Sequence, residues 1–130
     1  MSETLELSVY LREEPEVVYN AWLSSEAHTD FTGGKALIDP SVGGLYTAWD
    51  AYISGKTLVT QAPRRIVQSW RTTEFAESDP DSTLELLFSA EGEGTRLILR
   101  QSELPDGTGP AYTQGWEDFY FKPMREFFGG

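Results

Sequence analysis

The sequence predicts an α+β protein in which an antiparallel sheet wraps around a long C-terminal helix. Three observations carry this prediction. Apolar and polar residues alternate over residues 4–11, which is the period of a half-buried strand. Short strand-like runs separated by turn residues follow between residues 36 and 102. Aromatic residues then recur at three- and four-residue spacing from Trp116 to Phe127.

Two short helices are expected after the first strand. Pro15 follows acidic residues and suits the first helical position, so a helix is predicted to begin there. Either Ser24 or Ser25 caps a second helix, which runs through Phe31 and ends at Gly33.

About six strands follow these helices. They are predicted over residues 36–38, 45–49, 50–61, 66–71, 84–89 and 95–102. Gly55 marks a candidate break in the third of these runs. Consecutive short strands joined by turns favour an antiparallel sheet over β-α-β units.

The apolar face of such a sheet needs a cover, and the C-terminal helix is the only predicted element long enough to supply one. The helical spacing places Trp116, Tyr120 and Phe127 on the side that faces the sheet. Pro123 is expected to kink or break this helix, because proline removes a backbone donor.

Length and composition indicate a single domain over residues 1–130. The absence of cysteine excludes disulfides, zinc–thiolate sites and thiol catalysis. The net charge of −11 argues against binding of nucleic acid or of an anionic membrane surface. Two interpretations of this charge remain open: solubility, or an acidic face for a basic partner.

The localisation predicted from the sequence is cytoplasmic. The N-terminal residues lack the basic and apolar regions of a signal peptide. No apolar stretch approaches the roughly 20 residues of a membrane-spanning helix.

No motif assembles a reaction. His28 is the only histidine and is interpreted as a surface or hydrogen-bonded residue, although Glu26 and Asp30 lie nearby in the sequence. One histidine makes a weak metal site and does not by itself form a hydrolase triad. A glycosidase-like pair of carboxylates stays an alternative, because sequence does not give the separation of two carboxyl groups. We therefore predict no catalytic residue, no metal and no cofactor.

Aromatic residues are frequent enough to line a cavity between sheet and helix. The candidate ligand-binding residues are Trp22, Phe31, Trp49, Gln68, Trp70, Phe88, Trp116, Phe119 and Tyr120. Polar residues that could orient a ligand are Gln68, Arg71 and Gln114. The alternative interpretation is that the rings simply pack the core.

Several segments together resemble a known superfamily. They are residues 15–22, 43–44, 53–55, 63–71, 94–97 and 115–124. The chain resembles the START-like (SRPBCC) helix-grip superfamily, and within it the branch named after the activator of the heat-shock protein 90 ATPase. Residues 94–97 and 115–124 are the most specific segments, and the resemblance covers nearly the whole chain.

This resemblance implies a curved antiparallel sheet that grips the C-terminal helix, often with a cavity between them. Across the superfamily the cavity binds lipids, hormones or polyketides, and some members are enzymes. In the activator, this domain contacts the chaperone, which would connect the chain with the stress response. No segment here matches the chaperone-binding segment of the activator's separate N-terminal domain.

Three functions follow as hypotheses. The first is a non-enzymatic domain that holds a small apolar or amphipathic ligand between sheet and helix. The second is a co-chaperone-like interaction domain that acts on a heat-shock protein 90 homologue. The third, ranked last because no histidine-containing constellation supports it, is an enzyme of the cyclase or dehydratase type.

Overall fold

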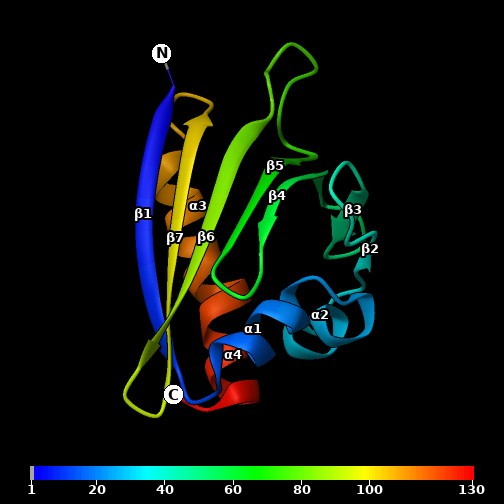
Figure 1. Ribbon diagram of the computed structural model, residues 1–130. Coiled ribbons are helices and arrows are strands. Elements are labelled where there is room, and N and C mark those ends of the chain that lie inside the picture. The colour runs from blue at the N-terminus through cyan, green and yellow to red at the C-terminus, as the bar shows by residue number, and fades with distance from the viewer. Residues whose placement is uncertain (1) are drawn as a thin grey trace.

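The computed structural model describes residues 2–130, and its elements follow the predicted order (Figure 1). Strand β1 (Glu3–Leu11) leads into helices α1 (Pro15–Trp22) and α2 (Ser25–Thr32). Six strands follow: β2 (Leu37–Ile38), β3 (Leu45–Ala48), β4 (Ile53–Gln61), β5 (Arg65–Thr72), β6 (Ser82–Glu91) and β7 (Gly94–Leu104). The chain ends with α3 (Gly109–Trp116), the π-helical turn η1 (Glu117–Phe121) and α4 (Lys122–Phe128).

The strands form one antiparallel sheet in the order β1-β7-β6-β5-β4-β3-β2. Each neighbour in space is a neighbour in sequence except for the pairing of β1 with β7, where Leu7 lies opposite Leu99. The long C-terminal helical segment crosses one face of the curved sheet, and α1 and α2 lie at one end of it (Figure 1). The α+β helix-grip prediction is therefore confirmed.

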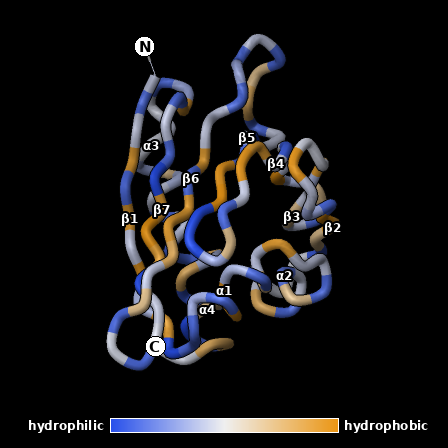
Figure 2. Tube along the Cα trace, in the orientation of Figure 1, coloured by the Kyte–Doolittle hydropathy of each residue, from blue (hydrophilic) through white to orange (hydrophobic). Residues whose placement is uncertain are grey.

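Strand alternation separates the two faces of the sheet. On β6, Leu84, Leu86 and Phe88 are buried beneath the helices. On the opposite face Glu85 pairs with Arg65 at 2.7 Å and lies 3.7 Å from Arg100. Figure 2 shows the apolar residues gathered along the central strands. Because these ion pairs are partly exposed, burial of the inner face carries most of the stability.

The C-terminal helical segment is interrupted just before Pro123. The N–H of Lys122 donates to the carbonyl of Glu117, five residues earlier, which makes this turn a π-helix. The predicted perturbation near Pro123 is therefore present as a π turn.

The π turn also corrects one predicted core position. Trp116 and Tyr120 are buried as expected, but Phe127 is 52% exposed. The extra residue of a π turn advances the following positions by one, so Met124 and Phe128 take the inward places. The Phe127 ring instead lies tilted against the Phe31 ring, with centroids 6.4 Å apart.

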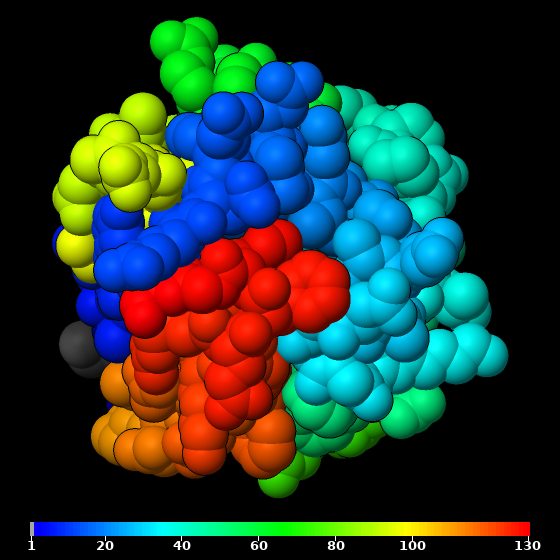
Figure 3. Space-filling model, turned by 90° about the horizontal axis from the view of Figure 1, so that it is seen from below, coloured from blue at the N-terminus to red at the C-terminus, as the bar shows by residue number. Residues whose placement is uncertain are grey.

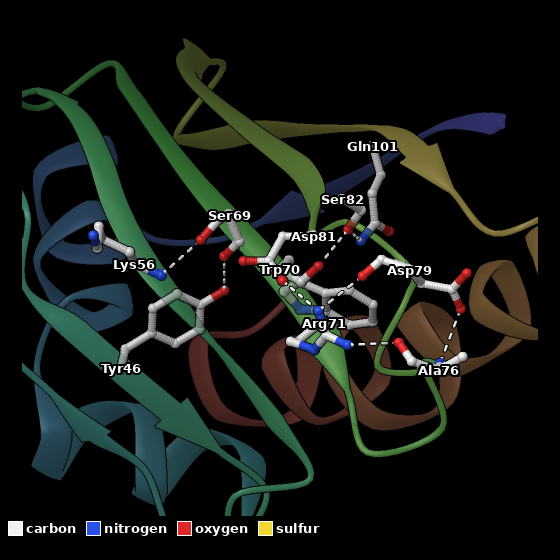
Figure 4. A network of polar contacts seen from close by, with 10 residues as sticks. All are labelled: Tyr46, Lys56, Ser69, Trp70, Arg71, Ala76, Asp79, Asp81, Ser82 and Gln101. Carbon is white, nitrogen blue, oxygen red and sulfur yellow. Dashed lines mark hydrogen bonds and ion pairs between the residues drawn. The ribbon is translucent and has the colours of Figure 1, made fainter.

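Gly55 does not break its strand, because β4 runs continuously from Ile53 to Gln61. The irregularity in its pairing lies between Thr57 and Val59. The glycine serves close packing: a Cβ atom at this position would lie 1.9 Å from the Ser69 carbonyl oxygen and 2.7 Å from the Tyr46 hydroxyl. That hydroxyl donates to the same carbonyl at 2.7 Å (Figure 4).

His28 is buried and fully hydrogen-bonded rather than at the surface. Its Nδ1 lies 2.9 Å from the carbonyl oxygen of Trp22, which only accepts, so Nδ1 carries the proton. Its Nε2 then accepts from the Tyr120 hydroxyl at 2.8 Å. Burial lowers the pKa of His28 to about 4, against the smaller opposing effect of its hydrogen bond to Trp22. This residue therefore ties α2 to η1 in its neutral form.

Both ends of the C-terminal segment are attached to residues at the two ends of β1. Glu3 accepts from the Gly109 N–H at 2.7 Å where α3 begins. At the other end the Arg12 N–H donates to the Gly129 carbonyl at 2.8 Å. Figure 3 shows this end packed between the N-terminal segment and α2. None of the helices in residues 2–130 has the length and apolar character needed to cross a membrane.

Replacing Gly55 with alanine is expected to destabilise the fold by about 3 kcal/mol or more, because the new methyl group meets backbone atoms that cannot move aside. Urea denaturation measures the change. The matched control is Gly115→Ala in α3, where a Cβ atom meets nothing within 4 Å. That control should gain about 0.5–1 kcal/mol from helix propensity. Equal stabilities of Gly55→Ala and wild type would contradict the packing argument.

The His28 contribution to stability should fall as the pH falls from 6.5 to 4. Because the folded state binds this proton more weakly than the unfolded state, protonation in that window favours unfolding. The expected loss is about 2 kcal/mol between pH 7.5 and pH 5, and about 3 kcal/mol in all. Denaturation of wild type and His28→Gln at each pH isolates the effect, because carboxylates titrate in both. A difference between the two proteins that does not vary with pH would contradict it.

Candidate functional site

A cavity of about 570 Å³ lies between the β3–β4 turn, β5 and the α3–η1 segment. This volume falls in the range of about 300–1,000 Å³ typical of small-molecule sites. Seven aromatic side chains line it: Trp49, Tyr52, Trp70, Tyr112, Trp116, Phe119 and Tyr120. Ile53, Glu74, Ala111 and Gly115 complete the lining.

The β3–β4 turn brings Trp49 and Tyr52 to the cavity through an unusual backbone. Trp49, Asp50 and Ala51 have φ angles of 51°, 57° and 70°, the left-handed region that side chains other than glycine rarely adopt. Each such residue costs roughly 1 kcal/mol or more, and such strain is found preferentially at functional sites. The turn is held by the Asp50 N–H, which donates to the Lys35 carbonyl at 3.0 Å.

The Trp49 ring forms one wall of the cavity. It lies so close to Gly34 that a Cβ atom there would approach ring carbon Cε3 to 2.4 Å. Phe119 meets the ring edge to face, with centroids 5.6 Å apart. The indole Nε1 of Trp49 is buried and has no hydrogen-bond partner among the described residues.

Strand β5 and helix α3 supply the opposite walls. Side chains alternate along the strand, so Trp70 faces α3 while Arg71 points to the other face of the sheet. Trp70 packs against Trp116 at 5.5 Å and perpendicular to Tyr112 at 5.2 Å between centroids. The hydroxyls of Tyr112 and Thr72 lie 2.7 Å apart, which fixes the Tyr112 ring.

A buried polar chain holds the tryptophan wall in place. The Trp116 indole N–H donates to the Gln101 side-chain oxygen at 2.9 Å. The Gln101 amide donates to Ser82 at 3.1 Å, and Ser82 donates to the Trp70 carbonyl at 2.7 Å. Figure 4 shows Gln101, Ser82 and Trp70 in this arrangement. The two tryptophans are thus linked by hydrogen bonds as well as by ring contact.

Arg71 organises the β5–β6 loop from the outer face. Its guanidinium pairs with Asp81 at 2.8 Å and donates to the carbonyls of Asp79 and Ala76 at 3.1 Å and 3.0 Å (Figure 4). These contacts close the loop that carries Glu74 to the rim of the cavity.

Among the described residues, those that line the cavity carry one carboxylate, that of Glu74, and no basic side chain. The Tyr52 hydroxyl donates to this carboxylate. Burial and this hydrogen bond raise the pKa of Tyr52 to about 12. Burial also raises the pKa of Tyr120. Both phenols are therefore neutral near pH 7, and their protons are already donated to Glu74 and His28.

Helix α3 presents two small residues, Ala111 and Gly115, to the cavity. They are four positions apart and so share one face of the helix. A Cβ atom added at Gly115 would meet nothing within 4 Å. The open volume therefore lies above a strip of helix that almost lacks side chains.

Of the nine candidate ligand-binding residues, five line the cavity: Trp49, Trp70, Trp116, Phe119 and Tyr120. The other four, Trp22, Phe31, Gln68 and Phe88, belong to the closed core. Trp22 contacts Tyr120 at 5.1 Å between ring centroids, Phe31 contacts Phe128 at 5.7 Å, and Phe88 contacts Tyr19 at 5.4 Å. Ligand binding by the five lining residues stays a prediction.

None of the three polar candidates reaches the cavity. Gln68 accepts from the Trp22 indole at 3.2 Å and donates to Thr57 at 3.2 Å, so its amide is already satisfied. Arg71 lies on the outer face, and the exposed Gln114 donates to Asp118 at 2.9 Å. Both α3 and the sheet thus direct these amide and guanidinium groups to protein partners.

Tyr52, Glu74 and Tyr112 are lining residues that the sequence did not single out. Tyr112 could have been found, because it precedes Trp116 and Tyr120 at four-residue spacing. Tyr52 and Glu74 lie in a turn and a loop, where no periodicity reports side-chain direction. No group of three or more histidine, aspartate or glutamate side chains in the described residues is arranged to hold a metal ion.

Comparisons with known proteins agree with this architecture. The family described as "Activator of Hsp90 ATPase homolog 1-like protein" matches residues 13–129. The human "Activator of 90 kDa heat shock protein ATPase homolog 1" is 26% identical over 115 residues, which are 88% of this chain. The chain spans about a third (34%) of the length of that relative.

Two solved structures show the same fold. A heat-shock protein 90 activator from Plasmodium falciparum superposes with a TM-score of 0.88 at 24% identity, over 97% of this chain and 96% of that one. CalU16 from Micromonospora echinospora superposes with a TM-score of 0.77 at 25% identity, over 95% of this chain and 76% of that one. Because the family match covers most of the residues, the chain belongs to the Activator of Hsp90 ATPase homolog 1-like family.

Proposed function

We propose that this chain is a non-enzymatic binding domain that holds one small apolar or amphipathic molecule between its sheet and its C-terminal helix. The observation that carries the proposal is the aromatic cavity of about 570 Å³. Ligand sites of this kind are mostly apolar with a few placed polar groups.

Exposed apolar surface at the cavity favours a ligand-binding site over the alternative that these rings only pack the core. Phe119 is 56% exposed and Tyr52 is 36% exposed. A molecule that covered these rings would remove apolar area from water at roughly 25 cal/mol per Å². Elsewhere in the core, as around Trp22 and Phe31, rings already pack against one another.

The small residues of α3 support the same conclusion. Gly115 lies inside a helix, where glycine costs about 1 kcal/mol relative to alanine. A larger side chain at this position would fill the space and bury the neighbouring rings. In a closely packed core this glycine would lower helix stability without a compensating contact. In a binding site it leaves open the volume that a ligand occupies.

The polar groups of the lining favour binding over catalysis. The hydroxyls of Tyr52, Tyr112 and Tyr120 are each engaged by a protein partner, and the described lining residues include no serine, cysteine or histidine that could form a nucleophile–base pair. The Trp49 indole N–H is buried and has no such partner within residues 2–130, so it adds no hydrogen bond to the lining.

Gly115→Leu should block the cavity without unfolding the protein. We expect wild type to bind the neutral probe N-phenylnaphthylamine saturably and in a 1:1 ratio, with a rise in probe fluorescence and quenching of tryptophan. Gly115→Leu should lower the affinity by at least about tenfold, since the leucine occupies the ligand's volume.

Gly115→Ala is the matched control, and it should bind the probe nearly as wild type does. Stability measured by urea denaturation should change by less than about 1 kcal/mol in both variants, because the added Cβ atom meets nothing within 4 Å and Gly115 lines the open cavity. Probe binding that is unsaturable, or unaffected by Gly115→Leu, would contradict a ligand site in this cavity.

A second candidate function is interaction with a chaperone of the heat-shock protein 90 type. It is favoured by the family match over residues 13–129 and by the name of the human relative. The charge of −11 suits a partner surface rich in lysine and arginine. Such an interface would bury on the order of 1,200 Å² or more.

Isothermal titration of the full chain into a purified heat-shock protein 90 homologue tests this candidate. We expect saturable binding that weakens as salt is raised, because long-range attraction between charged surfaces is screened. An unrelated folded protein of similar negative charge is the control. Absence of binding, together with an unchanged ATPase rate of the chaperone, would rule the interaction out.

A further inference from the structure

We propose that the ligand of the cavity is an organic cation: a quaternary ammonium or protonated amine that carries an aromatic or branched apolar group. The inference rests on the proposed binding function and specifies its ligand class. It is carried by two features that coincide in one place, an unpaired carboxylate at the rim and a wall of aromatic rings.

The first feature is the charge of the lining. Glu74 is the carboxylic acid of the lining, and no lysine, arginine or histidine within residues 2–130 lines the cavity. Within residues 2–130 the Glu74 carboxylate has no ion pair, and its hydrogen bond comes from the neutral Tyr52 hydroxyl. Since a carboxylate has about four acceptor positions, one such bond leaves capacity for a cation.

The basic residue nearest to Glu74 in the sequence does not neutralise it. Arg71 points to the outer face of the sheet and is held there by Asp81 and by two loop carbonyls (Figure 4). The backbone of Glu74 is fixed by its N–H, which donates to the Thr72 hydroxyl at 3.2 Å. The negative charge is therefore positioned at the rim and left without a protein cation.

The second feature is the ring wall. Trp49, Trp70 and Trp116 line the cavity together with three tyrosines and Phe119. The faces of aromatic rings carry partial negative charge, and tryptophan attracts cations most strongly. Cages of such rings are the recurrent solution for binding quaternary ammonium groups.

Other ligand charges fit this cavity less well. An anion would meet the Glu74 carboxylate and the aromatic rings, and the described lining residues offer it no basic group to pair with. A neutral aromatic molecule would fill the same volume but would gain nothing from Glu74. The chain's charge of −11 adds a long-range attraction for cations and none for anions.

Three probes of matched shape test the proposal: naphthylmethyl-trimethylammonium, its uncharged isostere neopentylnaphthalene, and the anion naphthylmethanesulfonate. Dissociation constants come from tryptophan quenching, because three of the four tryptophans line the cavity. The cation should bind wild type about tenfold or more tightly than the neutral isostere, and the anion should bind most weakly.

Glu74→Gln isolates the charge. It should weaken binding of the cation by about five- to tenfold and leave binding of the neutral isostere unchanged. The matched control is Glu77→Gln, which removes a carboxylate from the same loop outside the cavity lining and should leave both affinities unchanged. Raising the salt concentration from about 0.05 M to 0.5 M should weaken binding of the cation and should not weaken binding of the other two probes.

The outcomes separate this inference from the binding function. If the neutral isostere binds as tightly as the cation, or if Glu74→Gln weakens both equally, the cation proposal is overturned and the apolar binding site stands. If Glu77→Gln acts as strongly as Glu74→Gln, the attraction is general surface charge and the cation site is overturned. If none of the three probes binds wild type, the proposed binding function itself is overturned.

Discussion

The structure depends on the way Trp116 joins the C-terminal helical segment to the sheet. Its ring packs against Trp70 at 5.5 Å and Tyr120 at 4.8 Å, and its indole N–H donates to Gln101 on β7. A sheet with one apolar face needs a helix packed on that face. Trp116 holds the C-terminal helical segment against the sheet through these ring contacts and this hydrogen bond. Because the same ring lines the cavity, the contact that closes the core also forms the wall of the proposed site.

The π turn divides the helical segment into two parts with different surroundings. Beyond it, α4 is packed tightly, with Phe128 against Phe31 at 5.7 Å and Met124 fully buried. Before it, α3 turns Ala111 and Gly115 toward open volume. A regular helix would have placed Phe127 inward, so the inserted residue allows α4 to close while α3 remains open.

Much of the fold was predictable because it follows from periodicity. The alternation over β1 and the order of short strands and helices predicted the antiparallel sheet, and the recurring aromatics predicted the covering helix. The cavity was only partly predictable. Periodicity identifies a buried ring such as Trp70 or Trp22 but does not tell whether a second ring or open space faces it. Tyr52 and Glu74 were missed because their directions depend on the left-handed turn at Trp49 and on the loop closed by Arg71.

Among the described residues, Glu74 lacks an ion pair because Arg71 of β5 lies on the opposite face of the sheet. Arg71 and Trp70 are neighbours in sequence but point to opposite sides of the sheet. On the outer face the arginine pairs with the Asp81 carboxylate and donates to the Asp79 backbone carbonyl, so its charge is already compensated there. Glu74, in the same loop, instead reaches the cavity on the inner face. No basic side chain of the described residues lines the cavity beside it. A carboxylate without an ion pair beside aromatic rings is stabilised by water or by a ligand. A cationic ligand would supply the positive charge that no side chain of the described lining provides.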